Sequence, residues 1–238
     1  MIYICAIIAI ILALFLWYGV PLLYRWSVCV RHQKTCSKGI LCLTYDDGPD
    51  MAITPHILRL LEEYSVRATF FVLGSRLSGQ SDLAEEIARS NHELASHSQC
   101  HFDAWRSFPF MAFADIKRGY STLKKIAGST TVIRPPYGRL DLPSLIWLKL
   151  NRIRPVWWTH DSADCRIGEK TPEQLLEQVS RNGGGIVLLH DFLPDNDEHG
   201  TRHAYVLDCT RALIEHGQSQ GWKILIASEI DTLSSKTK

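Results

Sequence analysis

The sequence predicts an α/β protein, a distorted barrel of about seven parallel strands preceded by one N-terminal transmembrane helix. From residue 39 onward, short apolar runs rich in β-forming residues alternate with amphipathic stretches of helical period. That alternation is typical of repeated βα units, which build a parallel sheet that closes, or nearly closes, into a barrel. Ahead of them, residues 2–24 contain no charged side chain, and an apolar run of that length can cross a bilayer as a helix.

The apolar N-terminus is interpreted as a membrane anchor at residues 1–24. A cleaved signal peptide would begin with basic residues and contain a shorter apolar run, whereas Trp17, Tyr18 and Tyr24 have the positions of an interfacial aromatic belt. A buried core helix is the alternative. Residues 25–38 are polar and basic, and we expect them to connect the anchor to a domain at residues 39–238.

Seven strands and six helices are expected in this domain. The strand candidates are residues 40–45, 67–74, 92–96, 131–134, 155–159, 185–190 and 222–227. The helix candidates are residues 52–64, 81–90, 112–126, 142–150, 171–181 and 203–216. Thr171 and Pro172 are a good helix start, because proline is favoured at the first helical position. Every strand but the last is followed by a helix, so successive strands are expected to run parallel.

Composition and charge restrict the class of partner. The chain has 238 residues, of which 46% are hydrophobic and 21% charged, as in a globular protein with one substantial core. Its formal net charge is +1 and its Lys and Arg residues are scattered, so we expect no nucleic acid partner. Seven cysteines without a CxxC pair favour reduced thiols, although Cys36 and Cys42 are close enough in sequence to be bridged.

Polar side chains follow the predicted strands at their carboxyl ends. In a parallel barrel these ends share one face, so groups far apart in sequence converge on one site. They are Asp46 and Asp47 after the first strand, His97 and His101 after the third, Arg134 and Tyr137 after the fourth, Asp161 and Asp164 after the fifth, and His190 and Asp191 after the sixth.

The spacing of two histidines suggests a metal site. His97 and His101 are four residues apart, which places both imidazoles on one side of a helical turn. A carboxylate from Asp47 would complete a set of two histidines and one carboxylate that leaves a coordination position open for water or substrate. A solvated helix face is the alternative. The neighbouring carboxylates of Asp46 and Asp47 favour the metal, because they repel each other unless a cation lies beside them.

Five segments resemble, in order, the five motifs of the polysaccharide deacetylases, the NodB-homology or carbohydrate esterase family 4 domain. They are residues 44–49, 97–101, 134–138, 161–164 and 188–190, and residues 69–74 resemble the second strand of the family. The resemblance covers about residues 40–230. It implies a hydrolase acting on carbon–nitrogen bonds outside peptides, which removes N-acetyl groups, or O-acetyl groups, from a carbohydrate.

Carried over residue by residue, the resemblance implies a role for each site residue. The catalytic residues are Asp46 as general base, His190 as general acid, Arg134 as the partner of Asp46, Asp164 as the group that orients His190, and Tyr137, whose backbone N–H binds the oxyanion. Leu188 and Tyr137 contact substrate, and Asp47, His97 and His101 hold one divalent metal ion, expected to be Zn²⁺. Taken singly, His190 could be a core histidine and Asp164 a helix cap, but the order of the motifs argues against this.

The sequence departs from the family pattern at one cleft position. Cys165 stands where the family commonly has a tryptophan that walls the sugar groove, and Trp105, Trp157 or Trp158 are the candidates to replace that surface. Besides an acetylated glycan, a lipid-linked sugar processed by a deacetylase or deformylase is an alternative substrate. A catalytically silent carbohydrate-binding module on the same fold is a second alternative.

Two arguments about membrane orientation disagree. Basic residues follow the apolar run, namely Arg25, Arg31, Lys34 and Lys38, and this bias predicts a cytoplasmic domain. Enzymes of the family mostly act on cell-wall or extracellular glycans, which predicts the opposite. Because long domains can translocate despite such charges, we expect a single-pass membrane protein with its catalytic domain outside the cytoplasm.

Overall fold

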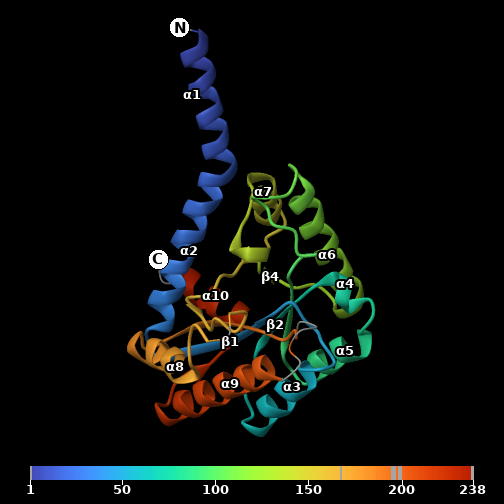
Figure 1. The fold of residues 1–238 in the computed structure, drawn as a ribbon, viewed down its shortest axis with the longest axis vertical. Coiled ribbons are helices and arrows are strands. Elements are labelled where there is room, and N and C mark those ends of the chain that lie inside the picture. The colour runs from blue at the N-terminus through green and yellow to red at the C-terminus, as the bar shows by residue number, and fades with distance from the viewer. Residues whose placement is uncertain (1, 167, 194–196, 198–199, 237–238) are drawn as a thin grey trace.

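The fold is an open, distorted barrel of parallel strands with helices packed around it (Figure 1). The computed structural model describes residues 2–166, 168–193, 197 and 200–236. Within them, eight strands form one sheet in the order β5-β4-β3-β2-β1-β7-β6, and β8 pairs with the first residues of β1. Every pairing is parallel, so the prediction of an α/β barrel of about seven parallel strands is confirmed.

Most elements occur where the sequence predicts them. The strands are β1 Ile40–Asp46, β2 Thr69–Val72, β3 Glu93–Ser96, β4 Val132–Ile133, β5 Arg154–Pro155, β6 His160–Asp161, β7 Gly184–His190 and β8 Lys223–Ile224. The α-helices are α1 Ile2–Leu14, α2 Val20–Cys36, α3 Thr54–Glu63, α4 Gly74–Leu77, α5 Ser81–Arg89, α6 Met111–Ala127, α7 Leu142–Leu150, α8 Pro172–Arg181, α9 Thr201–Ser219 and α10 Ala227–Lys236, with a π-helical turn η1 at Phe15–Gly19 and a 3₁₀ turn η2 at Pro136–Gly138.

Two expectations about elements are corrected. The predicted strand at residues 155–159 is two short strands, because the segment between β5 and β6 passes from one edge of the sheet to the other. Helix α10 begins where the last strand was expected to end. Its first N–H groups are capped from other strands: Ala227 donates to Thr69 Oγ1 at 2.8 Å and Ser228 to Glu93 Oε2 at 3.2 Å. Such caps leave no signal in the local sequence.

Alternation along β1 determines what reaches the site. Leu41, Leu43 and Tyr45 pack in the core beneath the outer helices. Ile40 and Cys42 belong to the second core cluster, on the opposite face of the strand. Since side chains alternate along a strand, the residues that follow on this second face are Thr44 and Asp46. The outer face is therefore apolar to the end of β1, whereas the inner face becomes polar at its carboxyl end.

The N-terminal segment is one continuous helix, Ile2–Cys36, that is long and apolar enough to cross a membrane. Helix α1 has no buried residue and projects away from the domain (Figure 1). Helix α2 packs on α10 and β7 and buries Val28, His32 and Cys36. The polar segment after the anchor is thus helical through Cys36, and one of its faces is part of the packed structure.

Asp231 of α10 makes a polar link between α2 and the barrel. Its carboxylate lies 3.3 Å from His32 Nε2 and 2.8 Å from Arg154 NH1, and both Asp231 and His32 are buried. Removing one partner of a largely buried ion pair leaves the charge of the other partner buried and unpaired, which destabilises the fold. This carboxylate therefore fixes the direction in which α2 leaves the domain.

We expect Asp231→Ala to lower the free energy of unfolding by about 2 kcal/mol, because Arg154 is partly exposed and a fully buried pair would lose more. Urea unfolding of the full chain in detergent micelles measures the change. Glu177→Ala is the control, since it breaks an exposed pair with Arg181 and should leave stability nearly unchanged. Equal destabilisation by both substitutions would contradict the structural role of Asp231.

Candidate active site

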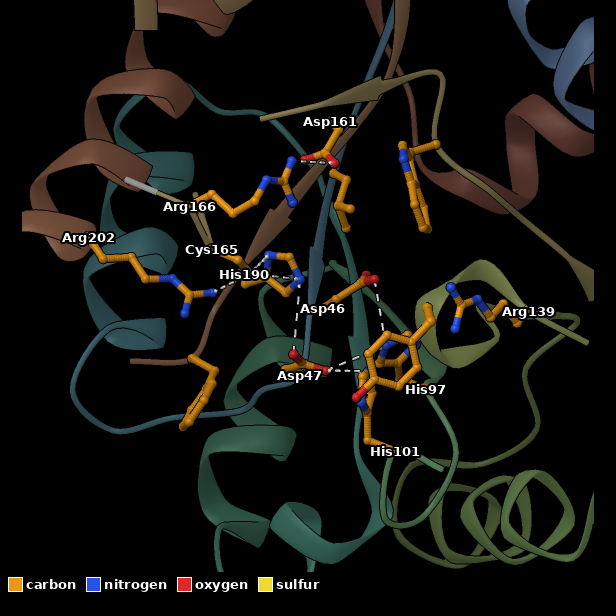
Figure 2. Close-up of a pocket in the computed structure, with 14 residues that line it drawn as sticks. Asp46, Asp47, His97, His101, Arg139, Asp161, Cys165, Arg166, His190 and Arg202 are labelled. Atoms are coloured by element: carbon orange, nitrogen blue, oxygen red, sulfur yellow. Dashed lines mark hydrogen bonds and ion pairs between the residues drawn. The ribbon is translucent and has the colours of Figure 1, made fainter. Parts of the chain in front are cut away.

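The predicted site residues meet in one cleft at the carboxyl ends of the strands (Figure 2). The cleft has a volume of about 530 Å³. Among the predicted residues, those that line it are Asp46, Asp47, His97, His101, Tyr137, Asp161, Leu188 and His190. Arg134 and Asp164 are buried behind them and contact Asp46 and His190. The sequence argument that these groups converge on one face of a parallel barrel is therefore correct.

A tight turn directs the Asp47 side chain into the cleft. Asp47 has a φ of 74°, and a Cβ on Gly48 would lie 2.0 Å from Asp191 Oδ2, so only glycine fits beside that carboxylate. Asp191 accepts hydrogen bonds from Gly48 N at 3.0 Å and from Thr54 Oγ1 at 2.9 Å. Burial raises the pKa of Asp191 to about 7. The sequence predicted that Asp191 lies at this edge of the sheet but did not predict its role. In the structure Asp191 supports the Asp47 turn.

Asp47 faces both histidines. Its Oδ1 lies 3.5 Å from His97 Nε2 and 3.4 Å from His101 Nε2, and the three ligand atoms are within 4.8 Å of one another. This buried oxygen has no hydrogen-bond partner among the described residues. A buried carboxylate oxygen facing two imidazole nitrogens is costly unless a cation lies between them. The three residues therefore fit a metal site of the predicted type.

The two histidines lie on a loop after β3, so the helical turn inferred from their spacing is wrong. Ser98 and His101 have φ values of 76° and 63°, which are incompatible with an α-helical turn. Asp115 of α6 holds the loop by accepting the backbone N–H groups of Cys100 and Phe102. Sequence reasoning missed Asp115, because this residue reaches the loop only through the packing of α6.

His97 is held in the tautomer that a metal ligand needs. Its Nδ1 donates to the backbone oxygen of Arg134 at 2.8 Å, which leaves the Nε2 lone pair directed toward Asp47. Burial lowers the pKa of His97 to about 3, and the nearby Asp47 charge only partly opposes that effect. The imidazole is therefore neutral at physiological pH and can act as a ligand.

Asp46 is a buried carboxylate paired with a buried guanidinium. Arg134 NH1 donates to Asp46 Oδ1 at 2.8 Å and to Thr44 Oγ1 at 2.8 Å. Burial raises the pKa of Asp46 above its ordinary value, and the positive charge of Arg134 acts against that rise. Asp46 Oδ2 lies 3.7 Å from His97 Nε2, so one oxygen is fixed by Arg134 while the other faces the cleft.

His190 and Asp164 form a second buried pair across the cleft. Asp164 accepts from His190 Nδ1 and from the His190 backbone N–H, each at 2.8 Å. Burial lowers the pKa of His190, but the charge and hydrogen bond of Asp164 outweigh it and hold the pKa well above 6.5. His190 Nε2 faces Asp47, whose Oδ2 is 4.0 Å away. The imidazolium is thus favoured and presents a proton to the cleft.

Tyr137 and Leu188 occupy the remaining predicted positions. Tyr137 has a left-handed backbone with φ 54° in η2, and its N–H has no acceptor among the described residues. A peptide N–H left without a partner at a cleft wall is a donor for an anion. Leu188 is 5% exposed and contributes an apolar patch to the wall.

Cys165 lies against the ring of His190. Its Sγ is 3.4 Å from His190 Nδ1 and accepts a hydrogen bond from Arg202 NH2 at 3.2 Å.

Of the three tryptophans considered as replacements for the family tryptophan, Trp158 lines the cleft and Trp157 is fully buried, while Trp105 packs beside Arg139. Sequence reasoning missed three cleft arginines, Arg139, Arg166 and Arg202, because none belongs to a motif. All seven cysteines are free, and Cys36 and Cys42 are not bridged.

A family model described as "Polysaccharide deacetylase" matches residues 33–152. A chitooligosaccharide deacetylase of Rhizobium leguminosarum bv. phaseoli is 33% identical over 177 residues, which are 70% of this chain and 76% of the relative. The chain belongs to the polysaccharide deacetylase family. The family resemblance stated from the five motifs is thereby confirmed, and with it the enzyme class, hydrolases of carbon–nitrogen bonds outside peptides.

Further members of the family are similar over most of the chain. A peptidoglycan-N-acetylglucosamine deacetylase of Bacillus cereus is 27% identical over 80% of this chain and 87% of its own length. The crystal structure of the Bc1960 peptidoglycan N-acetylglucosamine deacetylase superposes with a TM-score of 0.71 at 25% identity, covering 81% of this chain and 88% of that one. The barrel and its order of motifs are therefore those of the polysaccharide deacetylases.

Gly119 of α6 controls how closely this helix approaches the histidine loop. A Cβ on Gly119 would lie 2.0 Å from the backbone carbon of Ser98, the residue that follows His97 in the loop. We expect Gly119→Ala to cost about 2 kcal/mol of stability and to increase amide hydrogen exchange at residues 97–102, since overpacking must move the loop. Gly217→Ala in α9 is the control, because its Cβ would meet no atom nearer than 3.5 Å. Unchanged exchange in Gly119→Ala would contradict the inferred constraint.

Proposed function

We propose that the chain hydrolyses N-acetyl groups on a glycan in a metal-dependent reaction. One observation carries the proposal: the unpaired Asp47 oxygen faces the Nε2 atoms of His97 and His101, with the Asp46 carboxylate on one side and His190 on the other. A divalent cation, proposed to be Zn²⁺, would be held by Asp47, His97 and His101, and would supply polarisation of the acetyl carbonyl and activation of water. The alternative of O-acetyl hydrolysis needs the same groups.

Asp46 acts as general base in this proposal. Its free oxygen faces the cleft beside the proposed ligands, and a carboxylate can take the proton of an attacking water without being a ligand itself. Arg134 positions Asp46 by charge pairing at 2.8 Å and keeps its other oxygen occupied. The raised pKa of Asp46 makes it a stronger base than an exposed aspartate.

His190 acts as general acid from the opposite wall. Its Nε2 carries the proton that the departing amine requires, and Asp164 orients the ring and stabilises the imidazolium. The backbone N–H of Tyr137 is proposed to donate to the oxyanion, and Leu188 to contact the acetyl methyl group. A catalytically silent binding module would have no need for such an acid and base on either side of a ligand set.

The two adjacent aspartates are expected to respond differently to substitution. Asp46→Asn should lower turnover by about 10²–10⁴-fold with metal content unchanged, because it removes a base and not a ligand. Asp47→Asn, and equally His101→Ala, should lower the metal content itself. Elemental analysis and turnover of an acetylated glucosamine oligomer by each purified variant measure both effects. Equal metal loss in Asp46→Asn and Asp47→Asn would show that the division of roles is wrong.

The alkaline limit of activity is expected to depend on Asp164. His190 must be protonated to act as acid, so activity is present below its pKa and is lost as pH rises through it. Asp164→Asn removes the charge that raises this pKa, so the alkaline limb should move to lower pH. Asp161→Asn is the control, because Asp161 bonds Arg166 and not His190. An active Asp164→Asn enzyme with an unshifted limb would refute the pairing.

The substrate is proposed to be an acetylated glycan of the kind named in the relatives, peptidoglycan or chitooligosaccharide. A lipid-linked sugar is the second candidate, favoured by the cleft arginines, which suit an anionic group, and by the apolar helix α1. Product analysis with acetylglucosamine oligomers, peptidoglycan and polyprenyl-linked sugars separates them. The full chain in micelles is the right sample, since α2 supplies buried residues to the domain.

The anchor is proposed to span the membrane once, with the catalytic domain outside the cytoplasm. Its support is the length and full exposure of α1 together with the substrates of the relatives. Protease added to intact cells distinguishes the two orientations. Digestion of the domain supports the outward arrangement, whereas protection until the membrane is permeabilised makes the domain cytoplasmic.

A further inference from the structure

Exposed apolar side chains gather on one side of the domain. Outside Ile2–Cys36, ten large hydrophobic residues are exposed among the described residues, and six of them lie within residues 105–111 and 146–150. The six are Trp105, Phe108, Phe110, Met111, Ile146 and Leu150, which we call the apolar apron. Phe108 is 81% and Leu150 is 79% exposed. A cluster of exposed apolar side chains on an otherwise polar surface indicates a site of contact with a membrane or with another protein.

The apolar apron lies where the proposed membrane helix leaves the domain. The ring of Phe110 packs edge-on against Trp17 with centroids 5.2 Å apart, and Trp105 packs against Tyr18 at 6.2 Å. Helix α7, which carries Ile146 and Leu150, packs against η1. Figure 1 shows α7 and the start of α6 rising beside the helical N-terminus, on the side from which α1 projects. The apron and α1 therefore form one continuous apolar surface.

The height of the apron relative to α1 is fixed. The helix runs unbroken from Ile2 to Cys36, and one face of its second half, α2, packs against the domain. Arg25 NH1 donates to the backbone oxygen of Gly138 at 3.0 Å, and Lys149 Nζ lies 4.3 Å above the ring of Tyr24. A bilayer that contains α1 must consequently meet the domain at the level of the apron.

The charges around the apron are those that suit a lipid surface. Arg106, Lys149 and Arg152 are exposed at its edge. Asp103, a nearby carboxylate, is engaged by Arg139 and also lies 3.8 Å from the exposed Arg106. Basic side chains beside exposed aromatic and aliphatic ones are typical of segments that lie in the interface of an anionic membrane.

We propose that the apolar apron docks on the bilayer that holds α1, so that the catalytic cleft lies against the lipid headgroups. The inference rests on the proposed membrane span. Arg139 connects the two surfaces, because it lines the cleft and its guanidinium lies 4.8 Å from the Trp105 ring. Sugars presented close to the membrane are then the ones that reach the cleft most directly.

Photolabelling of the full chain tests the docking. The chain is reconstituted in vesicles of phosphatidylcholine and phosphatidylglycerol containing a phospholipid with a diazirine in its acyl chain, and the adducts are mapped by mass spectrometry. Adducts are expected in the tryptic peptide 107–117, which contains Phe108 and Phe110. The internal control is Met51, which is 65% exposed and lies three residues before α3, a helix at the end of the molecule opposite α1 (Figure 1). Labelling of peptide 107–117 no stronger than that of the Met51 peptide overturns the proposal.

A pair of matched variants completes the test. Phe108→Asp should reduce labelling of peptide 107–117 to the level of the Met51 peptide, whereas Met51→Asp should leave it unchanged. Persistent labelling in Phe108→Asp overturns the proposal. Turnover of a soluble acetylated oligomer in detergent should be equal in both variants and the parent. Absence of that turnover in the parent refutes the proposed function while leaving the docking result to stand separately.

Discussion

The pairing of β1 with β7 is the constraint on which the site depends. Seven residue pairs run without interruption from Ile40 beside Gly184 to Asp46 beside His190. The register brings the proposed base and acid to the same level of the sheet, and a slip of one residue would turn the side chains of one strand to the opposite face. Gly184 permits this register, since a Cβ there would lie 2.3 Å from the backbone oxygen of Ile40.

Burial makes the geometry of these groups specific. Arg134 is fully buried over the ring of Phe71, so its charge can be tolerated only with Asp46 and Thr44 in place. Asp191, also fully buried, is satisfied by Gly48 and Thr54 and in turn holds the Asp47 turn. Such pairs contribute little net stability, because desolvation offsets their attraction. Their effect is to fix donors and acceptors before substrate arrives, in a medium where charges interact strongly.

The sequence was sufficient for the parts of the fold that depend on local pattern. Apolar runs predicted β1 and β7, and polar residues at their ends predicted which side chains meet, because a parallel sheet has one carboxyl edge. It failed where tertiary contacts decide. The caps of α10 come from Thr69 and Glu93, and the loop of His97 and His101 is shaped by Asp115. A spacing of four residues fits such a loop as well as a helix, so spacing alone predicted the pair of histidines but not their backbone.

Helix α2 packs against the turn that contains Tyr137. Gly138, next to Tyr137, accepts hydrogen bonds through its backbone oxygen from Arg25 of α2 and from Trp157. Helix α2, which continues from the proposed membrane span, therefore touches the turn whose N–H is proposed to bind the oxyanion. A flexible tether would let the cleft sample many orientations, whereas a packed helix restricts it to one and raises the effective concentration of any sugar held at that height. The same contact means that removing α2 would alter the cleft wall itself, so the proposed anchoring and the proposed catalysis cannot be separated by cutting the chain between them.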